Sequence, residues 1–205
     1  MKFNVNIAVA VETIGRHIEE CNDSHFSERK KNQRIDMKKL NQIAYLKSGT
    51  VSMHKIDDGL VTITIKGPAI IGLGQMRGEK FTHYVRCNTN CELWVIDIDD
   101  ASELFSKFSL WNHAFDIITK HLYMYFSRDN MIHKNSVKEI VLEHAKKIWG
   151  VDEGSRKSIS IYSYILSRNN ISRSAIHKAV SELIRDGVLN VNKGRVIDFK
   201  QSFDN

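Results

Sequence analysis

The sequence predicts an α+β fold: a β-rich first half, then one long helix, then a smaller helical unit that ends in two short strands. Three observations carry this prediction. Apolar and polar residues alternate between about Ile43 and Ile98, apolar residues recur at helical spacing from Ser109, and two short apolar stretches follow Gly187. We therefore expect three parts, at residues 1–108, 109–134 and 135–205.

Composition sets the broad class of the protein. The 205 residues are 42% hydrophobic, which is enough for one large or two modest cores, and a single proline argues against a flexible linker. The first residues lack a signal-peptide pattern, and no apolar run approaches the roughly 18 residues of a membrane span. We expect a cytoplasmic protein that makes no membrane contact.

The β-rich part begins with a predicted hairpin. Val51 and Met53 alternate with polar residues, and residues 61–65 alternate in the same way. Asp58-Gly59 between them tolerates the positive φ of a tight turn. With further turns near residues 67–68 and 88–90, this pattern predicts an antiparallel β-sandwich or β-roll.

The long helix carries two apolar stripes. The first is a candidate dimer interface, whereas Ala114, Ile117, His121 and Met124 form a second stripe that would pack on the chain's own β-rich part. A single wide face buried within a monomer is the alternative. The first stripe, with successive spacings of four and three, contains Trp111, Phe115, Ile118, Leu122, Tyr125, Asp129 and Ile132.

The last third predicts a helix after Asn135-Ser136, then a winged helix-turn-helix. A short helix is expected over residues 163–169, and Ser172 is the predicted N-cap of a second helix that ends near Asp186. Its apolar positions predict a buried side made of Ile176, Val180, Leu183 and Ile184. Gly187 would end this helix, and Asn192-Lys193-Gly194 would join the two strands of the wing.

The charge and the exposed face of this second helix point to DNA. Residues 1–119 hold 15 Lys/Arg and 15 Asp/Glu, whereas residues 120–205 hold 15 and 9, so the whole excess of +6 is C-terminal. A major groove admits one helix, and an arginine at its N-terminus can bind guanine through two hydrogen bonds. A wing that binds protein instead of DNA is the alternative. The candidate contacts to double-stranded DNA are Ser172, Arg173, Ser174, His177, Lys178, Lys193 and Arg195.

Residues 171–176 (Ile-Ser-Arg-Ser-Ala-Ile) and 183–189 (Leu-Ile-Arg-Asp-Gly-Val-Leu) resemble the recognition helix and wing of the CRP/FNR superfamily. Residues 110–136 and 192–194 resemble more closely the IprA-type regulators, named as inhibitors of hydrogen peroxide resistance. The resemblance implies a cyclic-nucleotide-binding-like β-roll, a dimerisation helix and a homodimer that reads two half-sites. It also implies transcriptional regulation, a link to the oxidative-stress response and contact with RNA polymerase.

The β-roll departs from its cyclic-nucleotide-binding relatives. They hold the ribose with a Gly-Glu pair and the phosphate with an Arg-Ser/Thr pair, whereas residues 71–74 here are Ile-Gly-Leu-Gly and residues 81–84 offer no arginine in register. We expect no response to cyclic AMP and no cofactor, and the sequence does not identify a small-molecule effector. A cyclic-nucleotide or small-molecule activator of the ordinary CRP type is the alternative.

The remaining reactive residues predict neither an enzyme nor a metal site. Cys21 stands alone, the nine histidines do not cluster, and no motif pairs a nucleophile with a base. Cys87 and Cys91 are spaced so that a loop could bring them within bridging distance as a redox pair. Two ordinary cysteines near strand ends are the alternative.

Overall fold

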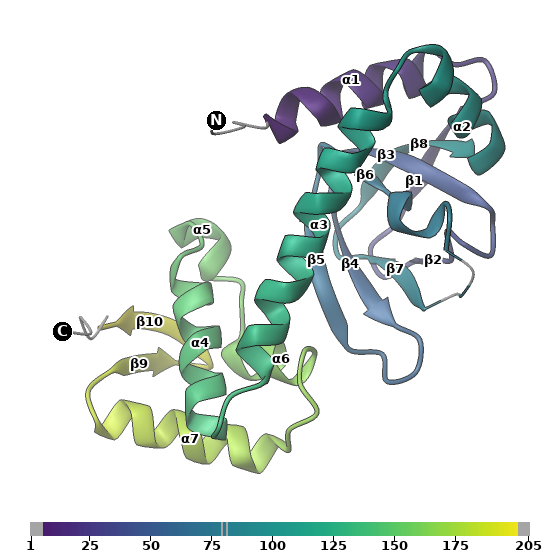
Figure 1. The fold of residues 1–205 in the computed structure, drawn as a ribbon. Coiled ribbons are helices and arrows are strands. Elements are labelled where there is room, and N and C mark those ends of the chain that lie inside the picture. The colour runs from purple at the N-terminus through teal and green to yellow at the C-terminus, as the bar shows by residue number, and fades with distance from the viewer. Residues whose placement is uncertain (1–5, 79, 81, 201–205) are drawn as a thin grey trace, which may run out of the picture. The chain divides into compact units, whose positions relative to one another are not determined.

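The computed structural model describes residues 6–78, 80 and 82–200, and the chain divides into two compact units, Met1–Tyr125 and Phe126–Asn205 (Figure 1). Helix α3 (Trp111–Ile132) contributes residues to both. Each unit has its own hydrophobic core. Phe81, in the segment compared above with phosphate-binding sequences, lies outside the described residues.

The first unit contains two four-stranded antiparallel sheets, with strand orders β1-β8-β3-β6 and β2-β7-β4-β5. Buried residues from both sheets, among them Leu46, Val51 and Leu93, share one core, so the sheets pack face to face. The strands are β1 (His25–Arg29), β2 (Arg34–Ile35), β3 (Gln42–Ser48), β4 (Thr50–Lys55), β5 (Val61–Lys66), β6 (Ala69–Ile71), β7 (His83–Cys87) and β8 (Cys91–Asp97).

The predicted hairpin is confirmed as β4 and β5. Val51 pairs with Ile65 and Met53 with Ile63 in an antiparallel register. Gly59 in the turn has a φ of +70°, a conformation that glycine adopts at low cost. The hairpin therefore forms where local turn chemistry and strand alternation agree.

Two helices lie in the part that the sequence predicted as β-rich. Helix α1 (Ile7–Glu19) is capped by Asn6, and α2 (Ile98–Lys107) begins directly after β8. Both pack with the start of α3 in a second core of this unit. The predicted change of period at Ser109 was therefore wrong, since the helical period begins at Ile98. Ser109 instead has a φ of +56° and separates α2 from α3.

The second unit is a winged helix-turn-helix, as predicted. Its core combines buried residues of three helices and both wing strands, including Val141, Ile165, Ile176 and Val196. Two predicted boundaries changed little, because α4 is capped by Ser136 and α7 by Ser172. The elements are α4 (Val137–Trp149), α5 (Glu153–Arg156), α6 (Ile161–Leu166), α7 (Arg173–Arg185), β9 (Leu189–Asn192) and β10 (Arg195–Phe199).

Two details of this unit correct the prediction. The first helix of the motif is Ile161–Leu166 instead of residues 163–169, because Ser160 accepts a hydrogen bond from the Ser163 amide and begins the helix earlier. Ile184 was predicted to be buried but is 42% exposed, and Ala179 is buried in its place. At about 100° per residue, Ile184 lies roughly 90° from the centre of the buried stripe, whereas Ala179 lies within it.

Candidate nucleic-acid interface

Helix α7 presents its N-terminus as a well-formed, capped end. The Ser172 hydroxyl accepts a hydrogen bond of 3.2 Å from the Ala175 amide and lies 3.1 Å from the Ser174 hydroxyl. The other free amides of this first turn, with the helix dipole, favour an anion such as a phosphate. Ser172 therefore organises the end of the helix on which the base-reading residues were predicted.

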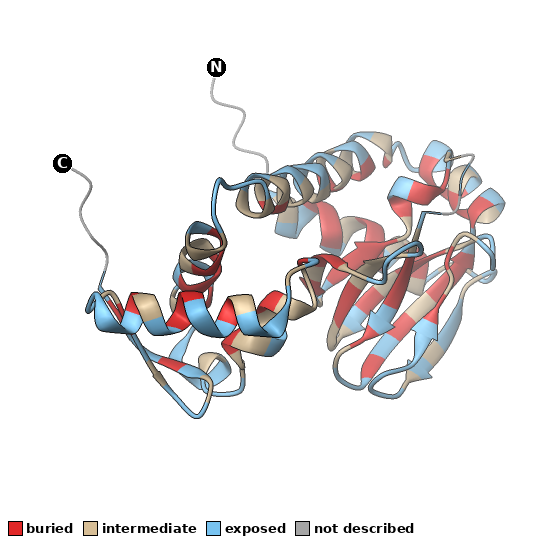
Figure 2. Ribbon diagram, turned by 90° about the horizontal axis from the view of Figure 1, so that it is seen from below, coloured by how far each residue is buried: buried red, intermediate tan, exposed pale blue. Residues whose placement is uncertain are grey.

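The outer face of α7 is polar and basic. Arg173, Ser174, His177 and Lys178 are all exposed, and Figure 2 shows exposed and buried residues alternating along this helix with its turns. The segment from Ser172 to Ser181 contains no acidic residue. Arg173 and His177 are four residues apart and so share one side of the helix. This face can approach a polyanion without like-charge repulsion.

The wing places two further cations on an exposed turn. Lys193 and Gly194 have φ values of +48° and +79°, the backbone of a tight two-residue hairpin turn. Lys193 and Arg195 are both exposed. The Ile161 amide donates a 2.8 Å hydrogen bond to the Gly194 carbonyl, so the turn is joined to the start of α6.

A ring pair that the sequence analysis did not identify connects α6 with α7. The rings of Tyr162 and His177 are stacked, with centroids 4.1 Å apart and planes inclined by 19°. The same tyrosine lies beside the wing, since a Cβ added at Gly194 would be 3.4 Å from Tyr162 Cδ2. Sequence spacing alone could not predict this contact, because Tyr162, His177 and Gly194 belong to different elements.

A buried polar pair supports the turn between α6 and α7. Asn169 donates from its amide nitrogen to His144 Nε2 at 2.7 Å and to the Ile165 carbonyl at 3.0 Å. Burial lowers the pKa of His144 to about 4, which keeps its ring neutral and able to accept. Arg128, in the last part of α3, donates a hydrogen bond of 2.8 Å to the Arg168 carbonyl in the same turn. Hydrogen bonds with α3, α4 and α6 therefore stabilise the turn that precedes α7.

The predicted dimer residues of α3 differ in exposure. Phe115 is 69% and Leu122 is 49% exposed, whereas Trp111, Ile118 and Tyr125 pack partly against the cores of the first unit. Ile132 is partly buried. On the second stripe, Ala114 and Ile117 are buried in the first unit. Tyr123 and Phe126 add exposed aromatic surface, at 66% and 56%, that the prediction did not include.

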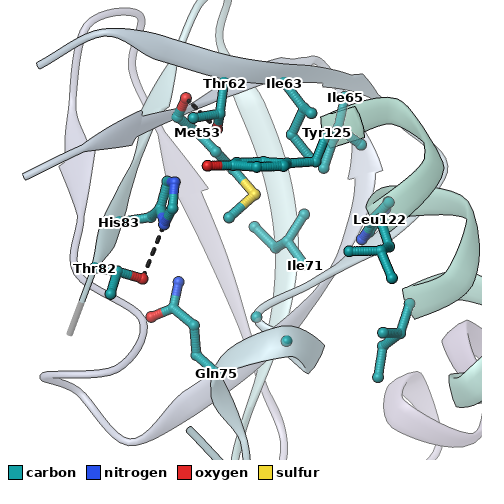
Figure 3. A pocket seen from close by; sticks show the side chains of 14 residues that line it. Met53, Thr62, Ile63, Ile65, Ile71, Gln75, Thr82, His83, Leu122 and Tyr125 are labelled. Atoms are coloured by element: carbon teal, nitrogen blue, oxygen red, sulfur yellow. Dashed lines mark hydrogen bonds between the residues drawn. The ribbon is translucent and has the colours of Figure 1, made fainter. Parts of the chain in front are cut away.

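The first unit contains a cavity of about 300 Å³ between its sheets and α3. Its walls are mainly apolar, and one polar group stands out. Gln75, in the short 3-10 helix η1 (Leu73–Gln75), is only 8% exposed, and neither end of its amide has a hydrogen-bond partner among the described residues. Figure 3 shows this amide directed from η1 toward the cavity, near Thr82 and His83. The described lining residues are Met53, Thr62, Ile63, Ile65, Ile71, Gly72, Gly74, Gln75, Thr82, His83, Ile118, His121, Leu122 and Tyr125.

Cys87 and Cys91 lie at facing ends of β7 and β8, and both thiols are buried and free. Burial, together with the neighbouring Cys91 thiol, raises the pKa of Cys87 to about 12. The thiolate is the form that reacts with peroxide, so this environment disfavours direct oxidation of Cys87. A switch between the two cysteines stays a prediction.

Two further observations concern metal and membrane. Within residues 6–78, 80 and 82–200, no group of three or more His, Cys, Asp or Glu side chains is arranged to hold a metal ion. No helix in the described part of the chain is both long enough and apolar enough to cross a bilayer.

The antiparallel sheets, the long helix and the winged helix-turn-helix together give this chain a CRP/FNR-like fold. The family model described as winged helix-turn-helix DNA binding matches residues 138–202.

Distant homologues of this chain are the proteins named inhibitor of hydrogen peroxide resistance. The protein of that name from Escherichia coli K12 is 27% identical over 153 residues, which cover 73% of this chain and 72% of the relative. The one from Salmonella typhimurium LT2 is 26% identical over 156 residues, which cover 75% and 74%.

Solved structures of transcription regulators share the fold. The c-di-GMP-responsive global regulator CLP of Xanthomonas campestris has a TM-score of 0.72 at 17% identity, covering 95% of this chain and 100% of that one. A CRP/FNR-family regulator from Eubacterium rectale has a TM-score of 0.66 at 14% identity, covering 93% and 91%.

Proposed function

We propose that this chain is a cytoplasmic, sequence-specific transcriptional regulator that binds double-stranded DNA as a homodimer. The observation that carries this proposal is the exposed face of α7, which is free of acidic residues from Ser172 to Ser181 and has Arg173 at its capped end, together with the cationic turn of the wing. In this proposal Arg173 and His177 contact base edges, while Ser172, Ser174, Lys178, Lys193 and Arg195 contact phosphates or neighbouring bases.

The proposed division of labour follows the chain. Residues 1–108 sense a signal, residues 109–134 dimerise and residues 135–205 bind DNA. Exposed apolar side chains on α3, such as Phe115 and Leu122, support dimerisation. Without a partner, this apolar surface would stay in contact with water, and a second copy of the helix would cover it. A two-fold dimer would present two α7 helices to half-sites about 34 Å apart. The homology to inhibitors of hydrogen peroxide resistance supports a role in the oxidative-stress response.

Selection of bound fragments from fragmented genomic DNA, followed by titration of a selected duplex over a salt series, tests this function. We expect a shared pseudo-palindromic motif and an affinity that falls steeply with salt, because bound phosphates release counterions. Sedimentation of the free protein and of the complex should show two chains per duplex. If no common motif is recovered and the DNA affinity is weak and independent of salt concentration, a protein-binding module would be favoured instead.

The cavity of the first unit favours a neutral, largely apolar effector. The described residues that line it include no Lys, Arg, Asp or Glu, so a cyclic phosphate would find no fixed countercharge there. The unsatisfied amide of Gln75 would be costly in a buried site unless a ligand or water satisfies it. A carbonyl or amide on an apolar body suits both the walls and Gln75.

Two neutral probes and one anionic probe test this assignment. We expect N-phenyl-1-naphthylamine to bind with increased fluorescence, benzanilide to displace it, and cyclic AMP to leave the melting temperature unchanged. Gln75→Leu should lower the affinity for benzanilide by roughly 3- to 10-fold, the effect of one hydrogen bond, and leave the affinity for the naphthylamine unchanged.

The matched control is Gln42→Leu, since the Gln42 amide donates to Asp97 and is not among the residues that line the cavity. This change should alter the affinity for neither probe. Stabilisation by cyclic AMP, or equal loss of benzanilide in both variants, would contradict a neutral-ligand site.

A further inference from the structure

The stacked pair of Tyr162 and His177 has a consequence for DNA recognition that rests on the function proposed above. His177 lies one turn after Arg173 on the exposed side of α7, so its ring edge belongs to the surface that would enter the groove. Both ring nitrogens lie in the plane of the imidazole, and each can donate or accept according to its protonation. The orientation of that plane therefore decides which base edges His177 can reach.

Tyr162 stacks its ring on that plane. It is half-buried at the start of α6, and its ring lies 4.1 Å from the imidazole in a nearly parallel stack. One face of the imidazole is covered in this way, while His177 as a residue stays exposed. An exposed side chain that is already held in one orientation loses less conformational entropy on binding than a free one.

Tyr162 lies beside the wing. A Cβ on Gly194 would be in ordinary van der Waals contact with the ring, 3.4 Å from Tyr162 Cδ2 and 3.6 Å from Cε2, so the ring lies directly beside the wing turn. The Gly194 carbonyl accepts from the neighbouring Ile161 amide. Burial also raises the pKa of the Tyr162 phenol, so the ring stays neutral at physiological pH. Wing turn, tyrosine and recognition helix therefore form one connected surface.

We propose that Tyr162 is a positioning residue for sequence recognition, which holds His177 in the orientation that reads a base pair. The sequence preference assigned to α7 then depends on a residue outside α7. A purely structural tyrosine would affect binding to all DNA sequences alike, whereas a positioning residue affects the same base pairs as His177.

The test compares variants on a selected operator and on all its single-base-pair substitutions. His177→Ala should relax the preference at one or two positions. Tyr162→Leu should relax the same positions, lowering discrimination there by roughly 3- to 10-fold, the effect of ordering one side chain. The preference at the positions that Arg173→Ala relaxes should stay unchanged. In a protein that already carries His177→Ala, Tyr162→Leu should cause no further loss of discrimination.

Tyr162→Phe is the matched control, because it keeps the stacked ring and removes only the hydroxyl. It should retain the wild-type preference at every position. Ring-current shifts of the His177 imidazole protons, measured by NMR on the free protein, should persist in Tyr162→Phe and disappear in Tyr162→Leu. If the leucine variant does not fold, Tyr162→Met, which also lacks a ring, takes its place.

Two results would overturn the inference: an unchanged preference pattern in Tyr162→Leu, or relaxation at positions other than those of His177→Ala. Either result, with wild-type binding and the Arg173→Ala effect intact, would leave the proposed function standing. Wild-type protein that shows no sequence preference would overturn both.

Discussion

Replacing Arg173 with alanine should abolish most of the sequence preference of this protein. The guanidinium at the start of α7 can donate two hydrogen bonds to one guanine, a contact that contributes about 1–3 kcal/mol of discrimination. We therefore expect operator affinity to fall by roughly 5- to 100-fold, with a much smaller change on random DNA. Fluorescence anisotropy with both duplexes at one fixed salt concentration measures the two effects.

Two controls separate base reading from general charge. Lys193→Ala in the wing should weaken operator and random DNA alike, and reduce the slope of log affinity against log salt by about 1, because one phosphate contact is lost. Arg185→Ala removes the same side chain from the last turn of α7, and should leave the preference unchanged. Equal losses on both duplexes for Arg173→Ala and Lys193→Ala would refute the assignment.

Acid should destabilise the second unit through His144. This ring is fully buried, and its pKa is lowered from 6.5 to about 4 by burial. The unfolded chain therefore takes up a proton below pH 6.5 that the folded chain takes up only near pH 4. The contribution of His144 to the free energy of unfolding is fully present above pH 6.5 and is lost as the pH falls toward 4. The total loss is about 3 kcal/mol, since each unit of pKa shift corresponds to about 1.4 kcal/mol.

The measurement is urea unfolding between pH 7 and 4, followed by hydrogen exchange of peptides from residues 137–185. His144→Leu is the control, because leucine does not titrate and Asn169 keeps its bond to the Ile165 carbonyl. The variant should be less stable at pH 7 but should lose less stability on acidification than the wild type. Parallel pH curves for the two proteins would show that His144 does not carry the effect.

Local sequence chemistry determined much of the second unit. The cap at Ser172 before α7, the end of that helix at Gly187 and the turn at Lys193-Gly194 were predicted from residue type, because caps and tight turns depend on a few neighbouring residues. The same reasoning predicted the hairpin of β4 and β5. It also identified the exposed basic residues of α7, since helical periodicity separates an apolar face from a polar one.

Local chemistry was less informative where an element depends on distant partners. Helix α2 follows β8 without a break, and strand alternation masked the point at which the period changes. Ile184 is apolar but exposed, while the smaller Ala179 is buried, because position around the helix decides burial and hydrophobicity alone does not.

What the sequence determined by itself is the fold class and the exposed basic face of α7, since both follow from spacings of a few residues. Only the tertiary structure decided how that helix is held and what the first unit encloses. Tyr162 meets His177, Asn169 meets His144, and Gln75 is directed toward an apolar cavity through contacts between separate elements. The physical reason is that such contacts depend on how the elements pack, and residue spacing along a chain does not record that packing.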